Sequence, residues 1–213
     1  MMTSKSNEKI ATRNWAEFID RLFREAEPYL AVRGDLSHAR VSHQYAVTLM
    51  NEEGGDRRIV EPAVILHDVG WSSLEPYQIK AAFGVKAHSR EAEKLNRVHE
   101  LEGASTARRI LLSLDYALPF IEEITSIIAR HDSGKETRSL EEALVKDADK
   151  LWRFSKIGFK MEIERQGLEA REYCEFLKVQ YGGWFFTSKA LMLAREELEK
   201  RAKEIELLSA ARD

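Results

Sequence analysis

A histidine–aspartate pair, His67 and Asp68, closes an apolar run in the stretch AVILHDVGW, residues 63–71. A carboxylate in apolar surroundings is costly unless a positive partner meets it. That partner can be a proton, a basic side chain or a metal ion. Imidazole and carboxylate groups are the donors that Zn, Fe, Mn and Ni sites use, so metal-dependent chemistry is one of three interpretations.

Three further histidines, His38, His99 and His131, have mostly apolar neighbours at helical spacing, as His67 does. This spacing predicts that each of them faces inward from a different helix, and Asp147 follows apolar residues in the same way. One inward histidine is more often a hydrogen-bonded core residue than a ligand. A helical bundle can converge side chains from several helices onto one metal site, but spacing alone leaves the core and the metal interpretations open.

The elements that must position these residues are helices. Apolar residues recur at helical spacing nearly everywhere, strand-like alternation is scarce, and the chain has only four prolines. The periodicity predicts helices over 14–30, 36–55, 61–70, 99–114, 118–131 and 139–154, followed by two longer amphipathic segments that divide near Gly182 and Gly183. We therefore expect an all-α fold in a single domain.

Local signals set the expected helix ends. Pro62 is expected in the first turn of its helix and Gly70 at the end, and Ser139 with Glu142 forms a capping-box pattern. Residues 72–98 show weak periodicity and predict a partly helical excursion over one end of the bundle. The charged residues of this excursion are expected to be solvated, and they include Lys80, Lys86, His88 and Arg90.

The motif VILHDVG resembles the signature of the HD superfamily of metal-dependent phosphohydrolases. His38, which lies 29 residues before His67, matches the upstream histidine of that family, and Asp147 in VKDADKL matches its downstream aspartate. The segments HELEGASTARRIL, which begins at His99, and IIARH, which ends at His131, resemble its middle helices. The resemblance covers about residues 35–155, and FFTSKALMLAREEL resembles the last helix of small bacterial members.

The resemblance implies a single HD domain over residues 1–213, with a metal-binding core at about 35–155 and C-terminal helices 156–213 packed on it. It implies one or two divalent ions, with Fe, Mn, Zn, Ni, Co and Mg all candidates. In the two-ion form Asp68 bridges the ions, whereas in the one-ion form two of the histidines instead contact the phosphate or protonate the leaving group. The implied metal ligands are His38, His67, Asp68, His99, His131 and Asp147.

Other residues near these motifs have expected roles of their own. The resemblance often places a lysine or arginine at Lys150, which would face an anionic substrate, so Asp68 and Lys150 are the expected catalytic residues. Asp149 is expected to orient a ligand or to pair with a basic residue. The family often has arginine where Val41 stands, and this departure makes His43 the reserve candidate for the first ligand.

The expected function is hydrolysis of a phosphate ester by a metal-activated water, with a small phosphorylated substrate such as a nucleotide. A di-iron oxygenase that resembles myo-inositol oxygenase would use the same ligand set and is the main alternative. A non-catalytic signalling module of the same fold is a further alternative. An HD-GYP phosphodiesterase is less compatible, because the Gly-Tyr-Pro tripeptide is absent from the sequence.

The composition of the chain limits the kinds of partner that we expect it to bind. The chain is 44% hydrophobic and 32% charged with a net charge of −3, and its acidic and basic residues are interspersed. We therefore expect no general membrane or nucleic-acid surface, while a homo-oligomer remains compatible with the sequence. The N-terminus lacks the apolar core of a signal peptide, and Cys174 is the only cysteine, so a cytoplasmic location is expected.

Overall fold

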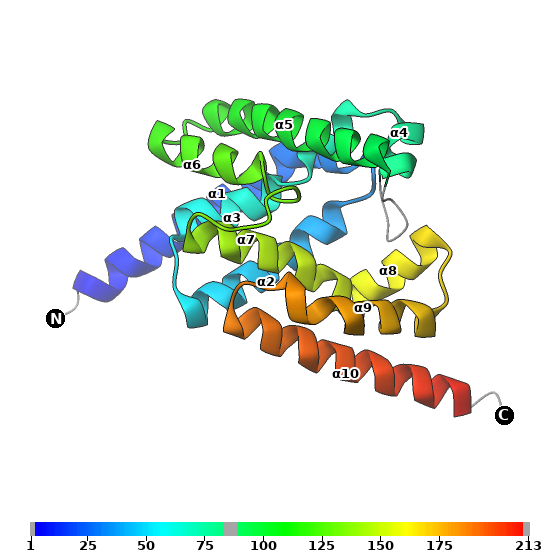
Figure 1. Cartoon of the computed structure of the whole chain (residues 1–213). Helices are drawn as coiled ribbons and strands as arrows, with labels where there is room; N and C mark the ends of the chain where they lie inside the picture. The colour runs from blue at the N-terminus through cyan, green and yellow to red at the C-terminus, as the bar shows by residue number, and fades with distance from the viewer. Residues whose placement is uncertain (1–2, 83–88, 211–213) are drawn as a thin grey trace.

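The computed structural model describes residues 3–82 and 89–210, and these residues form ten α-helices and two short 3-10 helices (Figure 1). The all-α prediction is confirmed. The elements in chain order are α1 Thr3–Leu30, α2 Leu36–Glu53, α3 Arg57–Leu66, η1 Val69–Ser73, α4 Pro76–Ala82, α5 Arg90–Ser113, α6 Leu118–Ile128, α7 Leu140–Leu151, η2 Trp152–Phe154, α8 Lys156–Gln166, α9 Ala170–Trp184 and α10 Ser188–Ala210.

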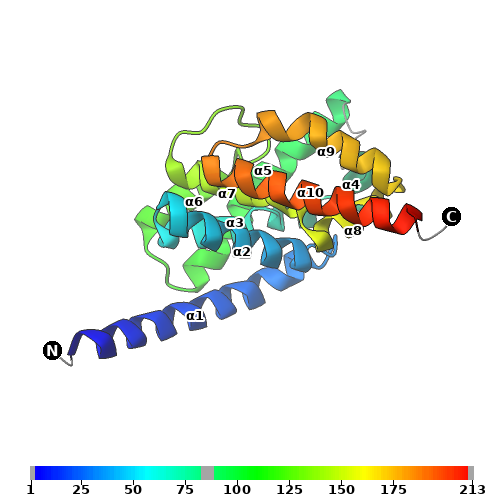
Figure 2. The same cartoon turned by 90° about the horizontal axis from the view of Figure 1, so that it is seen from below.

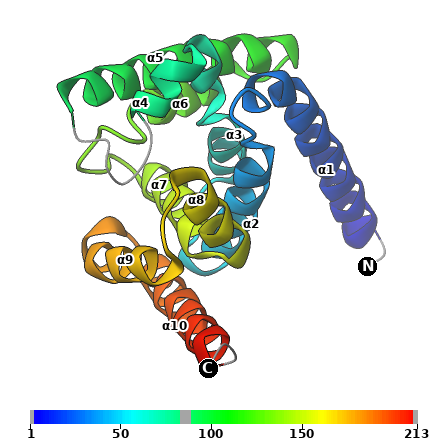
Figure 3. The ribbon, with the colours of Figure 1, turned by 90° about the vertical axis from the view of Figure 1, so that its right-hand side faces the viewer.

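Three central helices, α2, α3 and α7, pack on one another and form the middle of the molecule. The α5–α6 pair lies on one side of them and the α9–α10 pair on the opposite side (Figures 1 and 3). Helix α1 contacts α3, η1 and α5, and its N-terminal part extends beyond the other helices (Figure 2). Within the described residues, we find no helical stretch whose length and hydropathy would suit a membrane span.

Helix α3 begins earlier than its proline suggests. Asp56 is the N-cap and accepts a hydrogen bond from the amide of Arg58, so Pro62 lies inside the helix rather than in its first turn. A proline cannot donate to the carbonyl four residues before it, which here is that of Arg58. The hydroxyl of Tyr116 donates to this carbonyl at 2.7 Å and replaces the missing bond.

Several other predicted boundaries are wrong. Helix α1 begins at Thr3 rather than at Asn14, and α3 ends at Leu66 rather than at Gly70. Helix α5 begins at Arg90, nine residues before His99, because Ser89 caps it and accepts a hydrogen bond from the amide of Ala92. The last two predicted segments are three helices, because Gly167 ends α8 in the left-handed region at φ 62°. The glycines at 182 and 183 lie within α9.

The described part of the excursion at 72–98 is partly helical, as predicted, and contains the end of η1, helix α4 and the start of α5. Lys80 and Arg90 are exposed. Lys86 and His88 lie outside the described residues.

Two glycines allow η1 to lie directly on α5. A Cβ atom at Gly70 would lie 1.9 Å from the carbonyl oxygen of His99 and 2.5 Å from the amide nitrogen of Gly103. At Gly103 a Cβ atom would meet Gly70 at 3.3 Å. The backbone that follows His67 and Asp68 therefore contacts the backbone that carries His99, and no side chain fits between them.

We predict that Gly70→Ala lowers the free energy of unfolding by about 3 kcal/mol, because η1 and α5 must separate. The matched control is Gly182→Ala, since nothing lies within 4 Å of a Cβ atom at that helical position. The control should stabilise the protein by about 0.5–1 kcal/mol. Denaturant unfolding measures both values, and equal stability of the two variants would contradict the close approach.

Candidate metal centre

Four buried histidines converge from four segments of the chain. His38 is the third residue of α2, His67 caps the C-terminus of α3, His99 lies within α5, and His131 follows α6. The ring centroids of His38 and His67 are 5.0 Å apart, and those of His99 and His131 are 4.9 Å apart. The rings of His67 and His131, 5.1 Å apart, join the two pairs.

Backbone carbonyls fix two of these rings. Nδ1 of His67 lies 2.7 Å from the carbonyl of Val64, and Nδ1 of His131 lies 2.8 Å from the carbonyl of Ile128. Nδ1 must donate in such a contact, so in the neutral ring Nε2 carries the lone pair and is the nitrogen that could bind an ion. Metal-ligating histidines are oriented by hydrogen bonds of this kind.

The carboxylate of Asp68 lies between the two histidine pairs. Its Oδ2 is 3.2 Å from Nδ1 of His38 and 3.5 Å from Nε2 of His67. Its Oδ1 is 3.8 Å from Nε2 of both His99 and His131. Each oxygen of Asp68 therefore faces a different pair of imidazoles.

Two protein groups hold Asp68 in this orientation. The indole of Trp71 donates to Oδ1 at 3.0 Å, and the guanidinium of Arg33 donates to Oδ2 at 2.8 Å. Arg33 also forms an ion pair with Asp35 and lies over the Trp71 ring, with its Cζ 4.5 Å from the ring centroid. Asp68 is consequently fixed from both sides.

Two other aspartates complete the halves of the centre. Oδ1 of Asp149 is 3.0 Å from Nε2 of His38 and 3.5 Å from Nε2 of His67. Oδ2 of Asp132 is 3.4 Å from Nε2 of His99 and 3.7 Å from Nε2 of His131.

These side chains fit a divalent metal. The groups His38–His67–Asp149 and His99–His131–Asp132 each bring three donor atoms within 4.8 Å of one another. Within the described residues, Nε2 of His67 and both ring nitrogens of His99 are buried without a hydrogen-bond partner. Buried polar atoms are ordinarily paired, so unpaired nitrogens beside carboxylates indicate a site built for a cation.

Asp147 does not reach this centre. Its carboxylate accepts hydrogen bonds from the amide of Phe186 at 2.9 Å and from the amide and hydroxyl of Thr187 at 2.9 and 2.8 Å. It binds the backbone just before α10, and the prediction that Asp147 lies in the centre is corrected: Asp149 is the aspartate of α7 that lies beside the histidines. The two residues are two positions apart on α7, so their side chains point in widely different directions.

The reserve candidate also lies elsewhere. Nε2 of His43 is 2.7 Å from Oε2 of Glu61, a buried carboxylate that also accepts hydrogen bonds from Trp15 and Arg57. These contacts join α1, α2 and α3. His38, and not His43, is the histidine of α2 that the structure places in the centre.

The model of the HD-domain family matches residues 36–153, from the first residue of α2 into η2. The chain belongs to the HD-domain family. This match includes all four converging histidines together with Asp68, Asp132 and Asp149. A comparison with curated proteins found no match.

Solved structures of HD proteins share the fold. A predicted HD superfamily hydrolase from an uncultured Thermotogales bacterium is 19% identical, with 93% of this chain and 92% of that chain covered and a TM-score of 0.60. An HD-superfamily hydrolase from Bacillus thuringiensis is 22% identical, with 91% and 96% covered and a TM-score of 0.60. At this level of identity the likeness establishes the HD fold.

The aspartates of the HD centre are held ionised. Burial alone raises the pKa of Asp68, but His67 and Arg33 outweigh burial and hold that pKa well below its usual range. Burial likewise raises the pKa of Asp149, and Arg153 and a hydrogen bond from His38 more than reverse it. Ionised carboxylates are the form that binds a metal.

Burial and the neighbouring carboxylates shift the pKa values of the histidines in opposite directions. Burial lowers the pKa of His38, but Asp149 and Asp68 raise it to about 9. Burial also lowers the pKa of His131, and Asp132 and Asp68 raise it to about 10. For His99 burial prevails and the pKa is lowered. In the metal-free protein at neutral pH, protons therefore occupy two rings that an ion would need.

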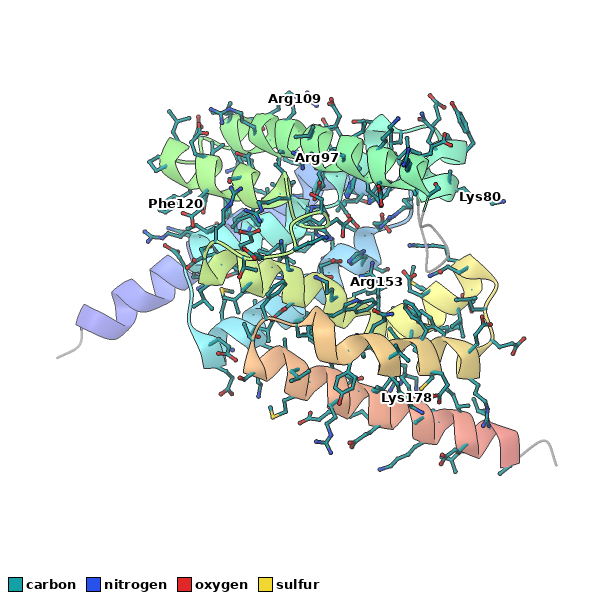
Figure 4. The ribbon with its side chains drawn as sticks, in the orientation of Figure 1. Lys80, Arg97, Arg109, Phe120, Arg153 and Lys178 are labelled. Carbon is teal, nitrogen blue, oxygen red and sulfur yellow. The ribbon has the colours of Figure 1, made fainter. Side chains whose placement is uncertain are left out.

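A cavity of about 430 Å³ opens beside the centre. Lys150 and Arg153, from α7 and η2, place two cations in its wall, and Figure 4 shows Arg153 near the middle of the molecule. Arg153 lies 3.7 Å from Oδ1 of Asp149, so it contacts the centre directly. Phe176 and Trp184 of α9 line another part of the cavity.

Sequence reasoning missed Arg33 and Asp132, and it named Asp149 as an orienting or pairing residue rather than as a candidate donor. Arg33 and Asp132 lie outside the α-helices, where helical periodicity gives no information on direction. Asp149 lies on α7, which is buried almost all round, so no single apolar stripe marks its inward face. One sequence signal could have indicated Asp132: it forms a second His–Asp doublet with His131.

We predict opposite effects for two aspartates of α7. Asp149→Ala should lower the metal content by the ion that His38 and His67 would hold, as measured by elemental analysis. Asp147→Ala should leave the metal content unchanged and lower the free energy of unfolding by about 2–4 kcal/mol, because it removes charge-assisted hydrogen bonds at a buried position. A stable, metal-free Asp147→Ala protein would contradict this assignment.

Metal binding should release protons. His38 and His131 hold protons below about pH 9 and about pH 10 in the metal-free protein, and a coordinating nitrogen must be deprotonated. We expect about two protons to be released per molecule at pH 7, and fewer as the pH rises through these pKa values. Titration calorimetry in buffers of different ionisation enthalpy measures this number, and a heat independent of the buffer would refute it.

Proposed function

We propose that the protein is a metal-dependent hydrolase of a phosphate ester. The observation that carries the proposal is the division of the two Asp68 oxygens between two His–Asp groups, next to a cavity that contains Lys150 and Arg153. The names of the two HD relatives as hydrolases support it.

The roles follow from position. His38, His67 and Asp149 would hold one ion, His99 and His131 a second, and Asp68 would bridge them. Divalent ions bound there would supply an activated water nucleophile and charge stabilisation for the phosphoryl oxygens.

Lys150 would bind a phosphoryl oxygen from the cavity wall. Burial lowers the pKa of Lys150, while Asp149 and Asp132 oppose that shift. The aromatic ring of Phe186, 5.5 Å from Nζ of Lys150, limits the directions open to this side chain. Arg153 adds a second positive charge, so the cavity favours an anionic substrate.

A di-iron oxygenase is the second candidate, because both His99 and His131 face the same oxygen of Asp68 and can hold the second iron that this chemistry needs. The cations of the cavity favour the hydrolase. A non-catalytic module ranks last, since the histidines and carboxylates of the centre are all present.

The decisive experiment measures phosphate release from phosphomonoesters and phosphodiesters, nucleotides included, by protein loaded with Mn, Co or Mg. Activity that depends on metal and disappears in Asp68→Ala supports the proposal. Tightly bound iron with O₂ consumption and no phosphate release would replace it by the oxygenase.

For the active substrate, we predict that Lys150→Met lowers kcat/KM by roughly 10²–10³-fold, since a preorganised cation is removed from the developing charge. Metal content should stay unchanged. Lys80→Met is the matched control, because Lys80 is exposed at the edge of the molecule on α4 (Figure 4). Equal losses in both variants would contradict a role for Lys150.

A further inference from the structure

We propose that Asp132 is a terminal ligand of the second metal position, with His99, His131 and Oδ1 of Asp68. This assignment rests on the metal centre of the proposed function and extends the ligand set that the HD motif implies. It gives the second position a carboxylate that corresponds to Asp149 in the first.

The distances give the two positions the same composition. Asp132 lies 3.4 and 3.7 Å from the Nε2 atoms of its two histidines, and Asp149 lies 3.0 and 3.5 Å from those of His38 and His67. Each position thus contains two imidazoles and one terminal carboxylate oxygen, with an oxygen of Asp68 beside it, which at the first position contacts Nδ1 of His38 and Nε2 of His67. A second position without Asp132 would have only three protein donors.

The ring of His99 is the strongest reason to place an ion there. It is fully buried and stacked on Trp71, with ring centroids 4.0 Å apart, and neither nitrogen has a hydrogen-bond partner among the described residues. Its Nε2 lies 3.4 Å from Oδ2 of Asp132 without a hydrogen bond between them. A buried nitrogen left unpaired beside a carboxylate is costly, and a cation between the two groups would remove that cost.

Helix α5 also holds Asp132 in place. The fully buried Glu100 follows His99 in the chain, and its Oε1 accepts the amides of Asp132 at 3.0 Å and Ser133 at 2.8 Å. Its Oε2 accepts the hydroxyl of Ser133 at 2.7 Å. His99 is therefore one proposed donor, and the adjacent Glu100 fixes the loop that carries the other, Asp132. Metal ligands are commonly held in place by hydrogen bonds of this kind.

The position of Asp132 distinguishes it from the other carboxylates. Its side chain is 38% exposed, against 7% for Asp149, and it lies in the wall of the cavity. The second ion would therefore lie nearer to the solvent and to an incoming substrate. Three carboxylates facing two dications leave a net positive charge, which suits a phosphate.

The test counts metal ions in Asp132→Ala. The apo protein is titrated with Mn²⁺ by calorimetry, and metal content is measured after gel filtration. Wild type should bind two ions, whereas the variant should keep one and bind the second at least about 100-fold more weakly, because a ligand is lost. Asp132→Glu, which retains a carboxylate, should restore part of the second affinity.

Glu93→Gln is the matched control, since Glu93 is an exposed acidic residue in the wall of the same cavity. It should bind two ions as wild type does. Circular dichroism and thermal unfolding of the apo proteins verify that each variant is folded.

Two results would overturn the assignment: a wild-type protein that binds one ion, or Asp132→Ala that binds two with unchanged affinity. In the second case Asp132 only pairs with a protonated histidine. Because ions are counted without a substrate, these outcomes are independent of phosphate release, and hydrolysis could persist if the assignment failed.

Discussion

The buried charge of Asp68 is the constraint on which the centre depends. A carboxylate removed from water needs positive charge and hydrogen bonds around both oxygens. Trp71 and Arg33 supply part of this, and the imidazoles of His38, His67, His99 and His131 face the remaining directions. No single helix can surround one carboxylate in this way. The N-terminal end of α2, the C-terminal end of α3, the middle of α5 and the turn after α6 therefore all contribute groups around this one side chain.

The close approach of the His67–Asp68 doublet to His99 depends on contacts between backbone segments as well as on side chains. The turn after Asp68 meets α5 through Gly70 and Gly103, so the distance between the His–Asp doublet and His99 is set by contact of main chain with main chain. Glu100 extends the same helix to the loop of Asp132. One helix thus determines the positions of two donors relative to Asp68, and such rigid support is what preorganised sites need.

Helical periodicity and the HD-like motifs predicted the all-α fold, the inward direction of the four histidines and the place of Asp68, because each lies on or next to a helix with an apolar stripe. The same reasoning failed for α7, which is buried on nearly every side, so spacing did not separate Asp147 from Asp149. It also failed for Arg33 and Asp132, whose directions depend on tertiary contacts with Asp68 and Glu100. The sequence therefore indicates which residue types lie in the centre. Long-range packing decides which of two nearby aspartates, Asp147 or Asp149, has its side chain there.

Helix α7 links the centre to the C-terminal helices. Asp149 faces the histidines, while Asp147, two residues earlier, binds the amides of Phe186 and Thr187 just before α10. Lys150 lies over the Phe186 ring, and Trp184 of α9 lines the cavity. The segment 36–153 that the family model matches thus contains the histidines and aspartates of the centre together with Lys150 and Arg153, and α9 adds Phe176 and Trp184 to the cavity wall. Phe176 and Trp184 belong to none of the groups that could hold a metal ion, so substitutions on this face of α9 would reshape the cavity wall without removing a candidate metal donor.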